Sequence, residues 1–137
     1  MAISDEKYVA STTFRKSGAP VPTPTWIVPL DGGRVGFWTS SASGKCKRLL
    51  RNPRIALQPC DARGRVRAGS APVEGTVDLV TSGADFDTIQ ARVRAKYGAM
   101  VHLSRFFNSL GHLGQGYPYG DVGVIVTAVT RTPGAFS

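Results

Sequence analysis

The sequence predicts a mainly β fold, an antiparallel barrel decorated by two helices, and two observations lead to this prediction. About six short segments rich in β-branched and aromatic residues alternate with turn signals made of glycine, proline, serine and asparagine. Only one long segment has apolar residues that recur at helical spacing. A chain of 137 residues, 42% of them hydrophobic, can bury one core, so we expect a single domain over residues 1–137.

Six strands are predicted, and turn residues connect the first three as hairpins at 16–18 and 31–33. The predicted strands are residues 8–14, 22–28, 34–39, 54–60, 73–80 and 122–130. Pro22 and Pro24 lack the N–H group that a central strand donates, so they indicate an edge strand or a bend.

The long helix is predicted to begin at Ser82 or Asp85 and to stop at Gly98. Its apolar positions recur at helical spacing: Phe86, Ile89, Val93 and Tyr97. A short helix is predicted over residues 45–51, after the serine-rich loop 40–44 and before Asn52 and Pro53. The apolar segment 100–110 and the glycine-rich segment 111–120 are assigned to no element.

The basic residues are concentrated in one part of the sequence. Residues 45–67 hold eight basic side chains against one acid, and therefore most of the chain's net charge of +8. These are Lys45, Lys47, Arg48, Arg51, Arg54, Arg63, Arg65 and Arg67. Such local charge predicts a site for a polyanion.

Several classes of protein and site are not expected. No apolar run approaches the ~20 residues that span a bilayer, and the first residues do not resemble a secretion signal, so we expect a cytoplasmic protein without a membrane partner. Cys46 and Cys60 are expected to be free thiols, and no metal site is expected. The common catalytic motifs are missing, and His102 and His112 lie in the unassigned segments. The sequence therefore names no catalytic residue, and a cofactor would supply the reactivity.

The loop and short helix at 40–51 are the best candidate for holding a phosphate. Serine hydroxyls, the free amides of the first helical turn and the ammonium group of Lys45 could converge on one anion. The remaining cations extend this charge beyond one phosphate group, although a solvated basic helix face has the same pattern. The candidate residues are Ser43, Gly44, Lys45, Lys47, Arg48 and Arg51.

Two tryptophans on neighbouring predicted strands could border a planar heterocycle. Trp26 and Trp38 each stand beside threonines whose hydroxyls can bond ring oxygens and nitrogens. These threonines are Thr23, Thr25 and Thr39. Packing in the core is the alternative role for either tryptophan.

In this order the motifs resemble the F-420-dependent branch of the pyridoxamine-phosphate-oxidase-like family, common in actinobacteria. The similar segments are 12–18, 20–26, 37–39, 43–49, 51–54, 59–61 and 73–75, and residues 122–129 fit the family's last strand. The likeness runs in unbroken order from residue 8 to residue 97. It does not extend to residues 99–120.

The resemblance implies a six-stranded antiparallel split barrel of the FMN-binding type, a homodimer with two cofactors in grooves at the subunit interface. It implies hydride exchange between a deazaflavin ring and a small unsaturated or oxidised organic substrate. Lys45 matches the family's phosphate-binding lysine. Ser43 stands where several relatives carry an arginine or a serine that also binds the phosphate. Thr23, Pro24, Thr25 and Trp26 match the strand that borders the ring, and Trp38 with Thr39 matches the next strand.

The expected cofactor is coenzyme F-420, because its phosphodiester and oligoglutamate tail carry several negative charges along an extended chain. FMN is the alternative, since relatives use it in the same fold. A non-catalytic module that binds a cofactor or a nucleic acid is the second alternative. Nucleic acid is disfavoured because residues 45–67 contain no aromatic side chain that could stack on bases.

Overall fold

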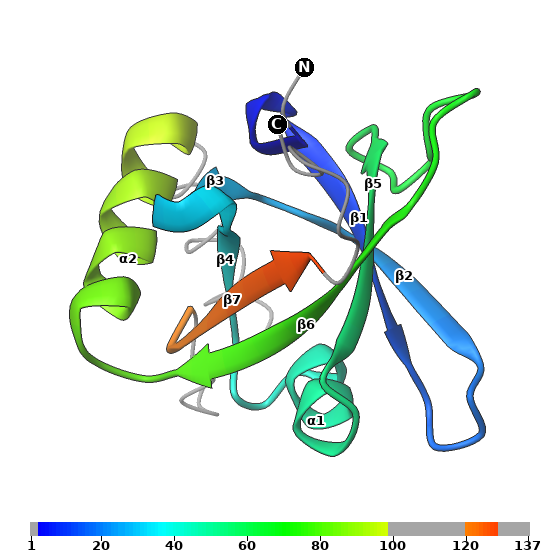
Figure 1. Cartoon of the computed structure of the whole chain (residues 1–137), viewed down its shortest axis with the longest axis horizontal. Helices are drawn as coiled ribbons and strands as arrows, with labels where there is room; N and C mark the ends of the chain where they lie inside the picture. Colours follow the sequence, from blue (N-terminus) through cyan, green and yellow to red (C-terminus); the bar gives the residue numbers. More distant parts are fainter. Residues whose placement is uncertain (1–2, 99–119, 129–137) are drawn as a thin grey trace, which may run out of the picture.

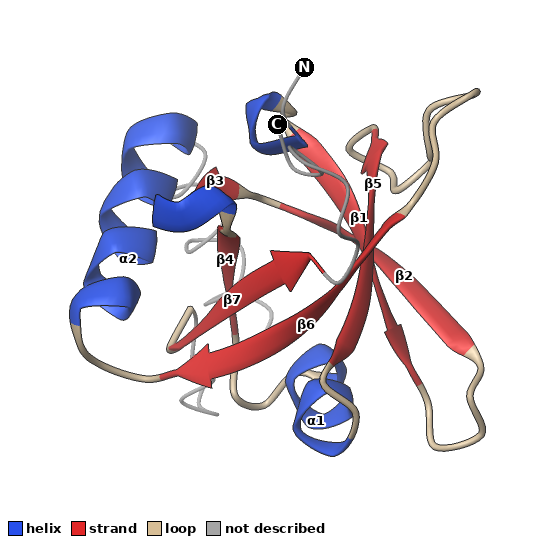
Figure 2. Ribbon diagram, in the orientation of Figure 1, coloured by secondary structure: helices blue, strands red, loops and turns tan. Residues whose placement is uncertain are grey.

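The computed structural model describes residues 3–98 and 120–128. Within these residues the chain forms seven strands, two α-helices and two short 3-10 helices (Figures 1 and 2). In chain order the elements are η1 (Ile3–Asp5), β1 (Tyr8–Phe14), β2 (Pro20–Thr25), β3 (Val28–Pro29), η2 (Asp31–Gly33), β4 (Val35–Thr39), α1 (Gly44–Arg51), β5 (Arg54–Cys60), β6 (Val73–Val80), α2 (Ala84–Tyr97) and β7 (Val122–Ala128).

Most predicted elements are confirmed within a residue or two. The strands predicted at 8–14, 54–60 and 73–80 have the bounds of β1, β5 and β6, and both helices are present. The last predicted strand is β7, which the structure describes as far as residue 128. The segments assigned to no element lie outside the described residues, except Gly120. No described helix has the length and apolar character needed to span a membrane.

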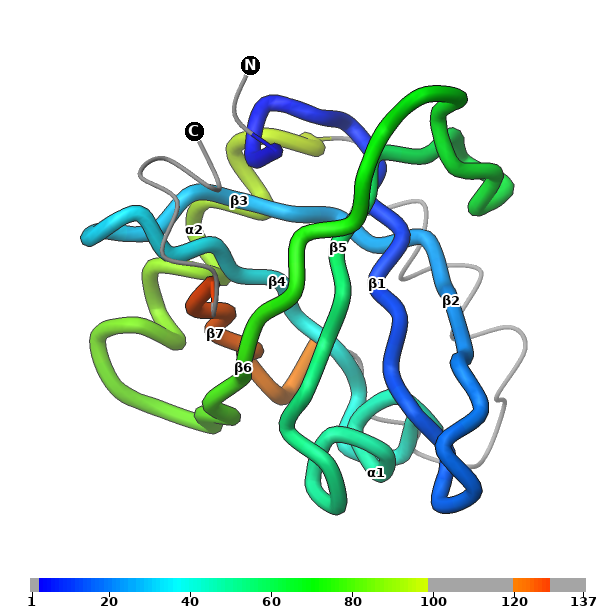
Figure 3. The backbone as a smooth tube through the Cα atoms, turned by 45° about the vertical axis from the view of Figure 1, so that its right-hand side comes forward, coloured from blue at the N-terminus to red at the C-terminus, as the bar shows by residue number. Residues whose placement is uncertain are grey.

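The strands form one antiparallel sheet in the order β2-β1-β5-β6-β7-β4-β3. This sheet curls, as Figure 3 shows. Its two outer strands, β2 and β3, follow each other in the chain, so the polypeptide itself connects the two edges of the sheet. β2 and β3 stand at opposite ends of the order, yet only Trp26 and Ile27 separate them. The prediction of one strand at 22–28, and so of six strands, was therefore wrong for the described residues: the chain leaves β1 after Thr25 and joins β4 at Val28.

Side chains of the last turn of α2 form hydrogen bonds with the main chain of Ile27, between β2 and β3. The Tyr97 hydroxyl accepts a hydrogen bond from the Ile27 amide at 3.0 Å, and Lys96 Nζ donates to the Ile27 carbonyl at 2.6 Å. The Trp26 ring stacks on the Tyr97 ring at 4.6 Å between centroids. Burial raises the pKa of Tyr97 to about 12, so its hydroxyl remains protonated. Side chains thus replace the strand partner that Ile27 lacks.

Two apolar clusters lie on opposite faces of the sheet. The first fills the barrel and includes Phe37, Leu57 and Val124, each with 0% exposure. The second lies between the sheet and α2, around Ile89. Strand alternation explains the separation, because successive side chains of a strand point to opposite faces. Gly36 allows α2 to approach β4, since a Cβ there would lie 3.0 Å or less from the side chains of Leu30 and Ile89.

The inner face of β1 is unusual because it carries hydroxyl groups. Val9 packs in the barrel, and Ser11 and Thr13 follow it on the same face with 0% exposure. Thr25 on β2 lies opposite Val9 and is also buried. Every buried polar side chain among the described residues has a hydrogen-bond partner.

β2 is an edge strand, as its prolines predicted. Pro20, Pro22 and Pro24 alternate with residues that face the barrel, and all three are exposed. The amide of Arg15 donates to the carbonyl of Ala19 at 2.9 Å, which sets the alternation of hydrogen-bonded pairs along β1 and β2. The proline positions consequently fall on the pairs whose main-chain groups point away from β1.

Candidate anion-binding site

A serine caps the helix that carries the basic side chains. Ser43 is the N-cap of α1, and its hydroxyl accepts a hydrogen bond from the Cys46 amide at 3.1 Å. The same hydroxyl donates to the carbonyl of Ser40 at 2.7 Å and lies 3.0 Å from Thr39 Oγ1. Ser43 and Thr39 therefore hold the loop and the start of α1 in place.

Lys45 is a half-buried cation on the first turn of α1. Its Nζ donates to Thr25 Oγ1 at 3.0 Å and lies 5.2 Å from the centroid of the buried Phe37 ring. Burial, with a smaller contribution from the charge of Arg48, lowers the pKa of Lys45 from 10.5 to about 8. The fold thus holds an ammonium group where its charged form is costly.

Arg48 lies one turn further along the same helix. Its Nε donates to Thr13 Oγ1 at 2.6 Å, and its guanidinium group passes so close to Gly44 that a Cβ there would be 2.7 Å from it. Burial and the charges of Arg15 and Arg51 lower the pKa of Arg48. Gly44 therefore leaves room for the guanidinium beside the start of α1.

Neutral hydroxyl groups hold two of the cations of α1, Lys45 and Arg48. Among the described residues, no ion pair includes any of the four basic side chains of this helix, namely Lys45, Lys47, Arg48 and Arg51. Lys47 and Arg51 are exposed. Cations that are close together, partly desolvated and not neutralised by carboxylates attract an anion.

The basic segment 45–67 does not form one continuous surface. β5 separates α1 from the hairpin that joins β5 and β6, and Figure 1 places these at opposite ends of the barrel. In the hairpin Arg65 pairs with Asp61 at 2.7 Å, and Arg67 with Glu6. At the start of β5, Arg54 lies 3.6 Å from Glu74. Arg63, exposed in the hairpin, is in no ion pair among the described residues, so most of the unneutralised charge of this segment, but not all of it, is at α1.

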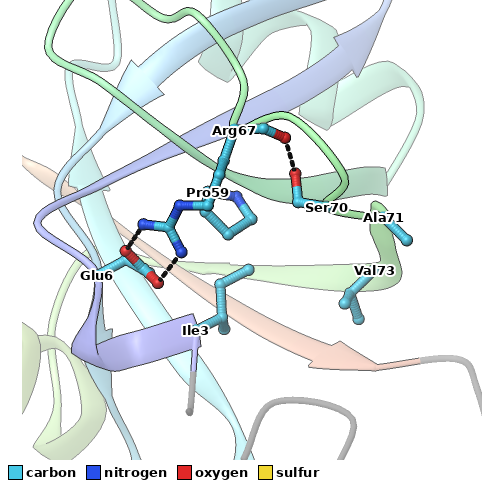
Figure 4. Close-up of a pocket in the computed structure, with 7 residues that line it drawn as sticks. All are labelled: Ile3, Glu6, Pro59, Arg67, Ser70, Ala71 and Val73. Atoms are coloured by element: carbon cyan, nitrogen blue, oxygen red, sulfur yellow. Dashed lines mark hydrogen bonds and ion pairs between the residues drawn. The ribbon is translucent and has the colours of Figure 1, made fainter.

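The hairpin end has a surface pocket of about 330 Å³, shown in Figure 4. Arg67 spans it and donates two hydrogen bonds to the Glu6 carboxylate, at 2.7 and 2.5 Å. Ile3, Pro59, Ser70, Ala71 and Val73 complete its lining. Both terminal nitrogens of Arg67 already bind the Glu6 carboxylate. This pocket therefore has fewer hydrogen-bond donors and less positive charge available for an anion than the α1 site has.

The structure brings together seven of the residues that the sequence suggested and separates the others. Hydrogen bonds and close contacts connect Thr23, Thr25, Thr39, Ser43, Gly44, Lys45 and Arg48 with one another or with β1. Pro24, on the opposite face of β2 from Thr23 and Thr25, is exposed. Lys47 and Arg51 lie on the exposed side of α1.

Trp26 and Trp38 lie on the α2 side of the sheet. Both pack against the second apolar cluster, whereas Phe37, next to Trp38 in β4, faces Lys45. The Trp38 ring has the Arg94 guanidinium 5.9 Å from its centroid, and Gly120 is so close that a Cβ there would be 2.9 Å from the ring. The structure does not bring the two rings to Lys45, and their part in binding a cofactor stays a prediction.

Three residues that hold the site were not singled out as site residues. Ser11 Oγ lies 2.5 Å from Thr25 Oγ1, and Thr13 accepts from Arg48. The alternation of Val9, Ser11 and Thr13 could have placed these hydroxyls inside the barrel. Asp121 accepts from the Ser41 amide at 2.8 Å and from its hydroxyl at 2.6 Å, which fixes the loop before α1. His102 and His112 lie outside the described residues.

Solved structures with this fold include several of related type. A Listeria innocua protein named for pyridoxamine 5'-phosphate oxidase is 14% identical with a TM-score of 0.60, and the match covers 93% of this chain and 88% of that one. An F-420 reductase is 17% identical with a TM-score of 0.60 and coverages of 93% and 91%. Rv2991 of Mycobacterium tuberculosis is 19% identical with a TM-score of 0.64 and coverages of 93% and 76%. At these identities the likeness shows the fold.

Sequence comparison supplies the family. The family model described as pyridoxamine 5'-phosphate oxidase matches residues 2–132. Comparison with curated protein sequences gave no match. The match spans nearly the whole chain and agrees with the curled antiparallel sheet. The chain belongs to the pyridoxamine 5'-phosphate oxidase family, whose members are flavin-binding oxidoreductases with a split barrel.

Proposed function

We propose that this protein is an oxidoreductase that binds coenzyme F-420 through the anion-binding site at the start of α1. One observation carries the proposal: Lys45 and Arg48 are half-buried, close enough to repel each other, and held by hydroxyl groups of Thr25 and Thr13. An arrangement that keeps two cations unneutralised at an energetic cost is expected where a ligand brings the compensating charge.

The residues present fit the anionic part of F-420. Lys45 and Arg48 would hold the phosphodiester, because charge-assisted hydrogen bonds to phosphate suit an ammonium and a guanidinium group. Lys47 and Arg51, exposed on the same helix, would attract the carboxylates of the tail. Thr23 and Thr25 supply hydroxyls on the adjoining strand. FMN carries one phosphate and would use fewer of these cations.

When bound, the deazaflavin would exchange a hydride with a small unsaturated or oxidised organic substrate. The contribution of the chain is to bind and orient this ring, since the side chains that hydrogen-bond around Lys45 are hydroxyls and cations. Thr39 and Ser43 keep the loop before α1 in place for this task. Trp26, Trp38 and Pro24 remain candidates for bordering the ring.

We extend the proposal to a homodimer with the cofactor at the subunit interface. The candidate ring-bordering residues Pro24 and Trp26 lie outside the barrel interior that contains Thr25. A cofactor that reaches both Lys45 and this outer surface would lie along the outside of one barrel, where a second copy would cover it. Light scattering should give twice the chain mass at micromolar concentration; a monomer that binds F-420 tightly would contradict the dimer.

The function is tested by titrating the purified protein with F-420, FMN and an oligonucleotide, followed by calorimetry and absorbance. We expect F-420 to bind more tightly than FMN, and the oligonucleotide to bind least. Lys45→Met should weaken F-420 binding by about tenfold to a hundredfold, the worth of a charge-assisted hydrogen bond. Arg67→Met removes a cation from the opposite end of β5 and is the matched control, with an affinity close to that of the unsubstituted protein.

Each other outcome has a definite meaning. Tighter binding of FMN than of F-420 would replace the proposed cofactor by FMN. An oligonucleotide that competes with both would support the non-catalytic alternative. If Lys45→Met and Arg67→Met weaken F-420 binding equally, the site is not at α1. Hydride transfer is then measured with the preferred cofactor against a panel of quinones and enones.

A further inference from the structure

Two buried hydroxyls on β1 need an explanation. The barrel interior is otherwise mainly apolar, yet Ser11 and Thr13 lie in it with 0% exposure. Burying a hydroxyl costs free energy unless it forms hydrogen bonds, and an apolar residue of the same shape avoids that cost. The partners of these hydroxyls therefore indicate why they are there.

Each hydroxyl leads to one cation of α1. Ser11 Oγ lies 2.5 Å from Thr25 Oγ1, which accepts from Lys45 Nζ at 3.0 Å. Thr13 Oγ1 accepts directly from Arg48 Nε at 2.6 Å. Ser11 and Thr13 lie two residues apart on one face of a strand, and Lys45 and Arg48 are neighbours on one face of a helix. Thr13 thus holds Arg48 directly, whereas Ser11 acts on Lys45 through Thr25.

A neutral acceptor positions a cation without cancelling its charge. A carboxylate in the place of Thr25 or Thr13 would bind the cation more strongly, but the pair would then have little attraction for an external anion. The charged groups that act on Lys45 and Arg48 are other cations: Arg48 on Lys45, and Arg15 and Arg51 on Arg48. The hydroxyls therefore hold the cations against mutual repulsion.

We propose that Ser11 and Thr13 are positioning residues, which fix Lys45 and Arg48 from inside the barrel so that two unneutralised cations face one polyanionic ligand. Neither residue touches the ligand. This inference rests on the proposed function of the α1 site.

The test replaces each hydroxyl by an apolar group of similar shape. Thr13→Val and Ser11→Ala should each weaken the binding of F-420 and of pyrophosphate by about three- to tenfold, since each removes one hydrogen bond of a network. Thr13→Ser keeps the hydroxyl and should retain most of the affinity. Thr12→Val makes the same substitution on the opposite face of β1 and is the control with unchanged affinity.

A pH profile separates positioning from general damage to the fold. In the unsubstituted protein, pyrophosphate affinity should fall as the pH rises through about 8, where Lys45 loses its proton. Thr25→Val removes the acceptor of the Lys45 ammonium group and should move this fall to lower pH, whereas Thr25→Ser should restore it. Thr13→Val acts on Arg48 and should leave the midpoint in place.

The outcomes distinguish the two proposals. If the unsubstituted protein binds neither F-420 nor pyrophosphate, the proposed function fails. If it binds both, but Thr13→Val and Ser11→Ala bind as tightly as Thr12→Val, the function stands and the positioning role is wrong. If Thr13→Val and Thr13→Ser lose affinity equally while both keep the midpoint of urea unfolding, shape rather than the hydroxyl matters, which also overturns the inference.

Discussion

The two ends of β5 both carry several basic side chains, but they use them differently. At the hairpin end, Arg65 and Arg67 are bound to carboxylates of Asp61 and Glu6. At the α1 end, Lys45 and Arg48 are bound to hydroxyls. Cations paired with carboxylates stabilise a fold modestly and offer little charge to a ligand. If the proposed anion site at α1 is correct, the partner of a cation, more than the number of cations, indicates where an anion binds.

The largest loss of ligand affinity is expected when a cation at the α1 end is paired with a carboxylate, as the arginines of the hairpin end are. Thr25→Asp would place a carboxylate beside Lys45, cancel its charge and weaken pyrophosphate and F-420 binding by about a hundredfold. Thr12→Asp adds the same charge to the outer face of β1 and should cost much less. Calorimetry measures both; equal losses would mean that net charge alone controls affinity.

Removing the ammonium group of Lys45 should stabilise the fold. The pKa of Lys45 in the folded protein, about 8, is below its ordinary 10.5, so the folded state binds fewer protons between these values and stability rises with pH there. At pH 7 we expect Lys45→Met to raise the free energy of unfolding by about 1–2 kcal/mol, a value discounted for partial solvation. Urea unfolding at pH 7 and pH 10.5 measures this.

That gain should largely disappear at pH 10.5, where the ammonium group is lost in the folded state and half lost in the unfolded state. Arg63→Met, in the exposed part of the hairpin, is the control and should change little at either pH. A loss of stability in Lys45→Met at pH 7 would show that Lys45 supports the fold instead of straining it.

Removing a charge at the hairpin end should lower the free energy of unfolding, the opposite of the effect of Lys45→Met, and by a smaller amount. Hydrogen bonds from Arg67 lower the pKa of Glu6, so this pair contributes stability above the ordinary pKa of 4.5, which is lost as the pH falls through the lower folded value. Glu6→Gln should reduce stability at pH 7 by less than Lys45→Met raises it. Thermal unfolding from pH 7 to pH 3 should show a weaker acid dependence in Glu6→Gln; an unchanged dependence would show that the pair is not formed in solution.

The smallest effect is expected from Arg51, which acts on a ligand only at long range. Arg51→Ala should weaken F-420 binding by about twofold at low salt and have no effect at 0.5 M salt, where exposed charges are screened. Arg65→Ala at the other end of β5 should have no effect at either salt concentration. A loss that persists in high salt would mean that Arg51 contacts the ligand directly.

The parts of the site that are local in sequence could be predicted. The loop before α1 and Lys45 are adjacent in the chain, and helix capping follows rules that short segments obey, so the loop and helix that carry Ser43 and Lys45 could be predicted; that these two residues bind an anion stays a prediction. Ser11 and Thr13 were missed because their role depends on which strand face lies opposite α1, a tertiary arrangement that strand patterns do not contain. The charged segment 45–67 misled for the same reason, since β5 carries its two halves apart.

The fold was predicted well where strand patterns are strong and less well where the chain closes the barrel. β1, β5 and β6 have clear alternation between turns, and their predicted bounds were confirmed. The division between β2 and β3 was missed because the continuous run 20–29 gives no turn signal at Trp26 and Ile27. Its cause is distant: Lys96 and Tyr97 bind the main chain of Ile27.

The prolines of β2 also determine what this edge of the sheet can recruit. An exposed edge strand normally offers alternating donors and acceptors, to which another strand can add, as in domain swapping or fibril growth. The outward positions of β2 are Pro20, Pro22 and Pro24, so this edge has carbonyl groups without a single N–H donor. The carbonyl groups of a second strand would face proline nitrogens, which have no hydrogen to donate. The chain can thus expose an open sheet edge in a crowded solution without extending the sheet into a neighbouring molecule.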